Sequence, residues 1–170
     1  MASKPQESSK QMMLNKNVAG GQLARFSMQP PTGFYRDGYC RVGPEDKGNH
    51  SVAAVVTEDF LNYSASQGNN LKEVGVKPGM KWCLCAHRWK DAFDAAQKGL
   101  LSNDAVPKVS LHATHEAALE KISYKELKQY ASVSEADAQS NRQPSHQNPG
   151  TSSIAKETTS IQGNRQSTAN

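Results

Sequence analysis

The alternation of apolar and polar residues predicts units in which a short strand is followed by a helix. The first unit has a valine-rich strand at residues 51–56 and a helix that follows Thr57, a favourable N-cap residue, and ends at Gly68. The second has a strand at residues 81–86 and a helix with one apolar face, which contains Trp89, Ala92, Phe93, Ala96 and Leu100. Short strands that alternate with helices are typical of domains whose helices pack against one sheet.

A third unit follows Pro107, with a strand at residues 108–112. Thr114 is placed to cap a short helix that runs to residue 121, and Ser123 with Glu126 forms a capping box for a last helix. We therefore predict a small single-domain α+β fold with three or more short strands, each followed by a helix packed on one sheet.

Before the first strand, residues 30–49 contain turn-forming residues in place of a regular pattern. Loops of about 20 residues are uncommon in compact domains and are usually functional or disordered. Three aromatic side chains could anchor this segment, so we predict a long, ordered, functional Gly-rich loop; its glycines and aromatic residues are Gly33, Gly38, Gly43, Gly48, Phe34, Tyr35 and Tyr39.

Composition limits this domain to the middle of the 170-residue chain. From residue 132 to residue 170, 21 of 39 residues are Ser, Thr, Asn or Gln, so this part has too few apolar side chains to form a core. We predict a disordered N-terminus at residues 1–13, one α+β domain at residues 14–131 and a disordered polar tail at residues 132–170.

The charge pattern does not indicate a nucleic-acid-binding surface. The net charge is +4, and the nearest approach to a basic cluster, Lys121, Lys125 and Lys128, has the spacing of a solvated helix edge. The longest apolar run, residues 52–56, has five residues, whereas crossing a bilayer takes about 20. We expect neither nucleic acid nor a membrane as a partner.

The cysteine content and the N-terminal residues predict a cytoplasmic protein. Three cysteines, with only one residue between Cys83 and Cys85, do not make the disulfide framework of a small secreted domain. Residues 1–13 contain no apolar segment typical of a secretory signal.

The first concentration of candidate site residues lies in the glycine-rich loop. Glycines let a backbone approach a ligand, and charged side chains orient it. Two interpretations stay open, a binding loop for a small anion or an internal network of ion pairs that only shapes the loop. Cys40, between two arginines, is either a reactive thiol or a buried one. The candidate ligand-binding side chains are Arg36, Asp37, Glu45 and His50, with Asp46 as a candidate acid or base.

Two further candidates follow the second and third strands. Cys83 and Cys85 would lie on one face of the strand, too far apart for a disulfide with each other, and either could be a nucleophile, a metal ligand or a small core residue. Arg88 opens the next helix, where anions are favoured. His115 opens the helix of the third unit, where it could act as an acid or base or cap local backbone. We expect Arg88 and His115 to border one crevice.

Several long stretches of sequence in these regions resemble a family of small bacterial and fungal proteins catalogued as domain of unknown function 2237. The stretches are TGFYRDGYC, GPEDKGNHSVAAVVTEDFL, KPGMKWCLCAHRW and LHATHE, and the resemblance covers about residues 15–131. It implies a compact α+β domain and no established activity.

Three hypotheses for function remain open on the sequence. The favoured one is a pocket that binds or transforms a small anionic molecule, held by Arg36 and Arg88, with His115 and Asp46 or Glu45 as acid and base and Cys83 or Cys85 as nucleophile. The alternatives are a non-enzymatic module that binds a protein partner and a zinc site drawing on Cys40, Cys83, Cys85 and a histidine. No phosphate loop or nucleotide fingerprint identifies a cofactor or a reaction.

Overall fold

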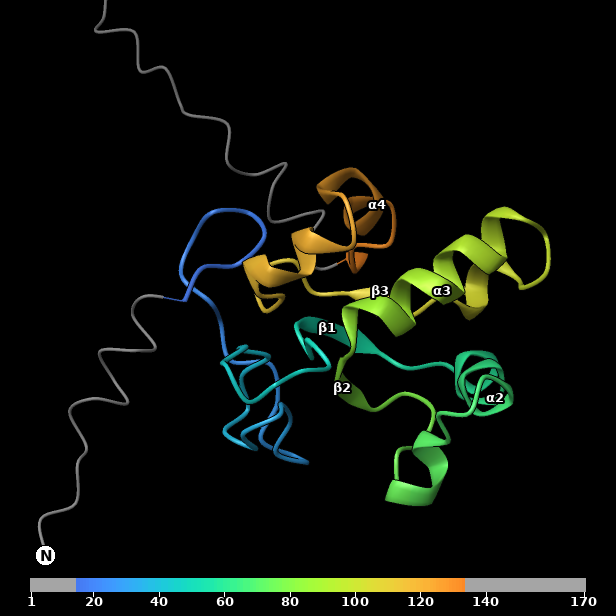
Figure 1. Ribbon diagram of the computed structural model, residues 1–170, viewed down its shortest axis with the longest axis horizontal. Coiled ribbons are helices and arrows are strands. Elements are labelled where there is room, and N and C mark those ends of the chain that lie inside the picture. The colour runs from blue at the N-terminus through green and yellow to red at the C-terminus, as the bar shows by residue number, and fades with distance from the viewer. Residues whose placement is uncertain (1–14, 134–170) are drawn as a thin grey trace, which may run out of the picture.

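The computed structural model of the chain describes residues 15–133, which form one mixed α and β unit (Figure 1). Both segments predicted to be disordered, residues 1–13 and all but the first two residues of 132–170, lie outside the described residues. The described part therefore holds all but the first residue of the predicted domain and every candidate site residue.

Three short strands form one antiparallel sheet with the order β2-β1-β3. They are β1 (Val52–Val55), β2 (Lys81–Leu84) and β3 (Lys108–Val109). In the central strand, Val52 pairs with Leu84 of β2 and Val55 pairs with Lys108 of β3. Because β2 and β3 both run antiparallel to β1, the residues that follow β2 lie at the same end of the sheet as the residues that precede β1.

The two main helices confirm the predicted units. Helix α2 (Glu58–Ser66) is capped by Thr57, whose hydroxyl accepts a hydrogen bond from the amide of Phe60, and α3 (Ala86–Gln97) follows β2 directly. A predicted capping box opens α4 (Tyr124–Gln129), with Ser123 and Glu126 bonded reciprocally. Short 3₁₀ helices occupy Leu71–Val74 (η1), Asn103–Ala105 (η2) and Glu116–Glu120 (η3).

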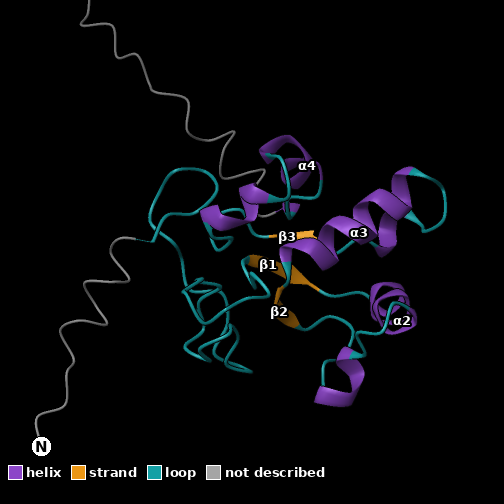
Figure 2. Cartoon of the chain, in the orientation of Figure 1, coloured by secondary structure: helices purple, strands orange, loops and turns teal. Residues whose placement is uncertain are grey.

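The two faces of the sheet are covered by different kinds of structure (Figure 2). On one face, apolar side chains of β1 and β2 join a large core with the helices, centred on the fully buried Trp89. On the other face, Cys83 and Ala53 pack with Phe26, Cys40 and Ala113 in a smaller cluster. We call this second side the loop face, because residues 15–50 cover it without a helix or a ladder of strands.

The third unit differs from the prediction in two details. The strand β3 has two residues instead of five, and the short helix is a 3₁₀ helix that begins after His115 instead of Thr114. Thr114 has a different role: its hydroxyl accepts from the amide of Ala53 at 3.1 Å and donates to the carbonyl of Ser110 at 2.7 Å. A side chain needed to join β1 to the chain after β3 cannot also cap a helix.

Helix length bears on the predicted absence of a membrane partner. None of the helices within residues 15–133 is long and apolar enough to cross a bilayer.

Candidate functional site

The antiparallel pairing of β1 and β2 brings two distant candidate residues together. His50 lies two residues before β1, and Cys85 immediately follows β2. If the register that pairs Val52 with Leu84 is extended by one residue, Ser51 lies opposite Cys85. Strand pairing therefore brings His50 close to the end of β2.

Cys85, His50 and Asp46 form one connected line of polar atoms. The Sγ of Cys85 lies 3.4 Å from Nε2 of His50, and Nδ1 of the same ring lies 2.6 Å from Oδ1 of Asp46. The second carboxylate oxygen of Asp46 accepts from the backbone amide of His50 at 2.9 Å. Because the carboxylate engages Nδ1, it directs the other ring nitrogen toward the thiol.

The carboxylate of this line is buried, and the other two members are partly exposed. The side chain of Asp46 is completely buried, whereas 35% of the His50 side chain is exposed and Cys85 is half-buried. Contact with Cys85 is the largest cause that raises the pKa of His50, to about 9, and Asp46 raises it further, against the opposing effect of burial. His50 is therefore an imidazolium at neutral pH, and it remains within reach of solvent.

The backbone before β1 passes close to the side chains of His50 and Cys85. A Cβ atom on Gly48 would lie 2.6 Å from Cε1 of His50 and 3.2 Å from Sγ of Cys85, so any other residue there would displace the imidazole. Asn49 has a φ of 50°, in the left-handed region that is unusual without glycine. It is held by bonds from its side-chain amide to the carbonyl of Ala117 and from the amide of Ala86 to its own carbonyl.

Cys85 is the N-cap residue of α3. The first amides of a helix carry a partial positive charge, so this end of α3 favours negative charge on a group bound there. The sulfur of Cys85 therefore lies between the start of α3 and the imidazole of His50.

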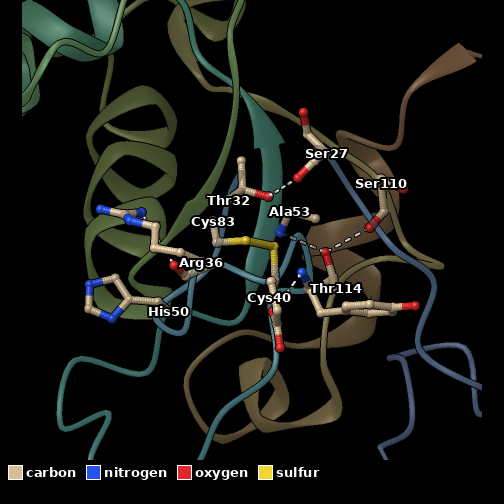
Figure 3. The surroundings of a disulfide bond; sticks show 12 residues. Ser27, Thr32, Arg36, Cys40, His50, Ala53, Cys83, Ser110 and Thr114 are labelled. Atoms are coloured by element: carbon tan, nitrogen blue, oxygen red, sulfur yellow. Dashed lines mark hydrogen bonds between the residues drawn. A yellow bond between two sulfur atoms is a disulfide. The ribbon is translucent and has the colours of Figure 1, made fainter. Parts of the chain in front are cut away.

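The other two cysteines form a disulfide, which corrects several expectations (Figure 3). Cys40 and Cys83 are bonded, with 5.3 Å between their Cα atoms, so Cys83 has no free thiol to act as a nucleophile and Cys40 is not a reactive thiol. The predicted zinc site loses two of its ligands to this bond, and residues 15–133 contain no group of three or more side chains that could hold a metal. Cys85 is the one free cysteine of the chain.

One side chain from the glycine-rich loop stacks on the imidazole, and a second is directed to the same side of the disulfide. The ring of Phe34, 43% exposed, stacks on His50 with centroids 5.9 Å apart. Arg36 places its guanidinium 4.8 Å from the centre of the Trp82 ring, and Figure 3 shows it directed to the same side of the disulfide as His50. Arg36 has a φ of 55°, so the loop holds this side chain with a strained backbone.

The remaining charged loop residues bind one another. Asp37 pairs with Arg41 at 2.6 Å, and Arg41 lies over the Tyr35 ring. Tyr35 donates to Glu45 at 2.6 Å, which raises the pKa of the tyrosine and lowers the pKa of the glutamate. Asp37 and Glu45 thus have the internal contacts that the alternative interpretation of the loop expected.

Arg88 and His115 point to other parts of the molecule. Arg88 donates to the carbonyl of Gln67 at the end of α2. His115 caps η3 by accepting from the amide of Ala117, and its Nε2 lies 3.0 Å from Oδ1 of Asn15. Burial lowers the pKa of His115. His115 borders an open hollow of about 540 Å³ with Glu116 and Glu120, and Arg88 does not contribute to it.

Cys85, His50 and Asp46 were all candidates on the sequence, but as members of separate groups. The spacing Asp46 to His50 was a usable signal, since four residues in a tight turn let a carboxylate reach an imidazole. The disulfide left no local signal, because its two cysteines are separated by 43 residues and their pairing depends on how the loop folds over the sheet.

Comparison with known proteins identifies the family of this chain. No curated protein matches the chain. A family profile described as an uncharacterised protein conserved in bacteria, DUF2237, matches residues 16–131. This match covers most of the chain and the whole of the Cys85, His50 and Asp46 cluster, and the protein therefore belongs to the DUF2237 family.

Proposed function

We propose that this protein is an enzyme in which Cys85 is the nucleophile, His50 carries the proton and Asp46 orients His50. The observation that carries the proposal is the unbroken line from Sγ of Cys85 through the imidazole to a buried carboxylate. A nucleophile, a base and a third group that orients the base are the recurring parts of covalent catalysis by serine and cysteine.

Acyl transfer is the chemistry that these groups support best. His50 holds the proton taken from Cys85, and the sulfur attacks the carbonyl carbon of an ester, thioester or amide. His50 then donates its proton to the leaving group as the carbonyl re-forms, which leaves a thioester on Cys85. Water, deprotonated by His50, then attacks the thioester. The carboxylic acid leaves, the sulfur of Cys85 is free again, and the proton taken from water remains on His50.

Polar groups near Cys85 are placed to stabilise charge on the carbonyl oxygen. The first-turn amides of α3 directly follow Cys85; that of Ala86 is bonded to the carbonyl of Asn49, which leaves those of His87 and Arg88 for this role. The hydroxyl of Ser51 is buried and has no hydrogen-bond partner among residues 15–133, and the extended register places Ser51 opposite Cys85. A donor without a partner next to a nucleophile supports the assignment of this region as an oxyanion site.

Phe34 and Arg36 support a substrate with an apolar part and an anionic group. The exposed ring of Phe34 covers one side of His50, and the guanidinium of Arg36 lies against Trp82. An arginine held against an aromatic ring keeps its charge available to a carboxylate or phosphate. This assignment retains the small anionic molecule expected from the sequence and replaces Arg88 and His115 with Phe34.

The test uses a chromogenic ester, p-nitrophenyl acetate, and the non-reduced full-length chain. We expect a burst of p-nitrophenol and an acetyl group on Cys85, located by peptide mass spectrometry. Cys85→Ala removes the burst, and His50→Gln slows it by at least about 100-fold, the usual contribution of a positioned acid or base. His87→Gln is the matched control, because His87 is also close to Cys85 in sequence but faces solvent beside Asp91.

The charge preference is tested with the mono-p-nitrophenyl ester of succinate. Arg36→Gln is expected to slow the reaction of this anionic ester more than that of the neutral acetate. No acetyl-enzyme at Cys85, or an equal burst in His50→Gln and the wild type, would contradict the enzyme proposal and favour the non-enzymatic interaction module.

A further inference from the structure

A second concentration of charge lies at the opposite end of the loop face from Cys85. Val55 of β1 pairs with Lys81 of β2 on one side and with Lys108 of β3 on the other. Residues paired across neighbouring strands project from the same face of a sheet. The two lysines therefore flank Val55 in a row that crosses all three strands.

A cavity of about 220 Å³ opens over this row. Arg25, from the segment that covers the loop face, joins Lys81 and Lys108 in its lining, and Phe26 and Val55 supply apolar surface. The other two lining residues are Ser110 and Ser132. The lining thus combines three cations with two hydroxyl-bearing residues, and it includes no carboxylate.

Aromatic rings hold the three cations in place without neutralising them. Lys81 lies 5.5 Å from the centre of the Phe26 ring, Lys108 lies 5.0 Å from that of Tyr130, and the Arg25 guanidinium lies 5.5 Å from that of Tyr39. A cation held against the face of a ring keeps its full charge.

Several other cations of the described domain have carboxylate partners. Lys72 pairs with Glu58, Lys90 pairs with both Asp94 and Glu126, and Arg41 pairs with Asp37. Within residues 15–133, none of the three cations at the cavity forms an ion pair with a carboxylate. A concave surface lined by one sign of charge concentrates the electric field and attracts ions of the opposite sign.

We propose that this cavity binds a small molecule carrying a phosphoryl group. Three cations around one cavity suit a group that carries close to two negative charges and several acceptor oxygens, more than a carboxylate offers. The apolar surface of Phe26 and Val55 would face the organic part of a phosphate ester. The volume is below the usual 300–1,000 Å³ of pockets for drug-sized ligands, which favours a compact metabolite over a polymer.

This site is separate from the Cys85 cluster and does not depend on the proposed acyl transfer. Lys81 and Cys85 are four residues apart along β2 and its extension, about 13 Å at the usual rise of a strand. Between them, on the same face, the Cys40 and Cys83 disulfide packs with Phe26 and Ala53. A buried cluster thus divides the two regions.

The test follows backbone amide chemical shifts of the full-length protein during titration with inorganic phosphate and with glycerol 3-phosphate. Glycerol and an equal ionic strength of sodium chloride are the reference titrations. We expect saturable shifts at residues around Val55, Lys81 and Lys108, with tighter binding of the ester than of inorganic phosphate. Equal affinities would identify inorganic phosphate itself as sufficient for the site.

Variants assign the binding to the cavity. Lys81→Gln, Lys108→Gln and Arg25→Gln should each weaken binding by about fivefold, since one partly exposed charge contact contributes up to about 1 kcal/mol. Lys81→Arg keeps the charge and should retain binding, which separates a loss of charge from a loss of fold. Lys98→Gln, at the end of α3, is the matched control. Shifts that increase linearly, or that weaken equally in Lys98→Gln, would overturn the proposal.

Discussion

The two faces of the sheet are stabilised by different physics, and the candidate chemistry lies on only one of them. The helical face is a continuous apolar core in which Trp89 stacks on Phe93 and meets the edge of Tyr130. The loop face depends on a disulfide, on hydroxyl and carboxylate bonds to backbone, and on two strained residues, Arg36 and Asn49. Packing therefore accounts for the fold, whereas covalent and polar links position Cys85, His50 and Asp46.

This difference predicts that the two faces respond differently to mutation. A change in the helical core should reduce the stability of the whole domain, because the core is shared by all three strands. A change on the loop face should reduce the reactivity of Cys85 more than it reduces stability.

Trp89→Ala should give the largest loss of stability. Trp89 is completely buried, and its Nε1 donates to the carbonyl of Pro107 at 3.0 Å. Truncation of a buried tryptophan costs about 3–5 kcal/mol and here also leaves that carbonyl without its donor. Urea denaturation followed by circular dichroism measures the loss. A change below about 1 kcal/mol would show that the helical face does not depend on this residue.

Removal of the disulfide should affect both properties. The bond joins residues 43 apart, and its loss in the double variant Cys40→Ser, Cys83→Ser costs about 4 kcal/mol in the chain-entropy estimate. The loop that carries Asp46 and His50 is then no longer tied to β2, so alkylation of Cys85 should slow even in conditions where the protein stays folded. Unfolding and alkylation measured on the same sample separate the two effects. Unchanged alkylation in the folded variant would mean that strand pairing alone positions His50.

Gly48→Ala should change reactivity with a smaller effect on stability. The new methyl group would lie 2.6 Å from the imidazole and 3.2 Å from the sulfur, so the ring must move away from Cys85. The matched control is Gly21→Ala, where the nearest atom to the new methyl group lies at 3.5 Å. We expect slower alkylation of Cys85 in Gly48→Ala and no change in Gly21→Ala; equal rates in both variants would refute the close approach.

The pH dependence of stability should show the smallest effect. Because the pKa of His50 is raised in the folded state from 6.5 to about 9, its contribution is complete below about pH 6.5. That contribution is lost as the pH rises through about 9. Burial lowers the pKa of His115, so this histidine acts in the opposite direction and reduces stability as the pH falls below about 6.5. Thermal midpoints between pH 5.5 and 9.5 should fall at the alkaline end in the wild type and less in His50→Gln.

The sequence predicted most of the helices that pack on the sheet, although Leu100, expected on the apolar face of α3, lies beyond its end at Gln97 and is 77% exposed. Caps at Thr57 and Ser123 and the apolar spacing around Trp89 are local signals, and the structure confirms the helices that they predicted. The 3₁₀ helix after His115 was misplaced by one residue because Thr114 satisfies backbone groups of β1 and the chain after β3, a demand that only the tertiary structure creates.

The loop face could be predicted only in part. Glycines, charges and aromatic residues marked the loop as a candidate site, but long-range pairing decided which residues meet. Cys40 is bonded to Cys83, 43 residues further along the chain. His50 lies next to Cys85 because β1 pairs antiparallel with β2. The expected crevice between Arg88 and His115 assumed that equivalent positions of successive units share one site, and their observed partners are Gln67 and Asn15 instead.

The most direct test of the account is the rate of alkylation of Cys85 by iodoacetamide at pH 6.5, measured for the non-reduced wild type and for His50→Gln. The imidazole of His50 lies 3.4 Å from the sulfur and can take its proton during the attack, so we predict a rate about tenfold higher in the wild type than in His50→Gln. His87→Gln should match the wild type. Equal rates in the wild type and His50→Gln would contradict the claim that His50 activates Cys85.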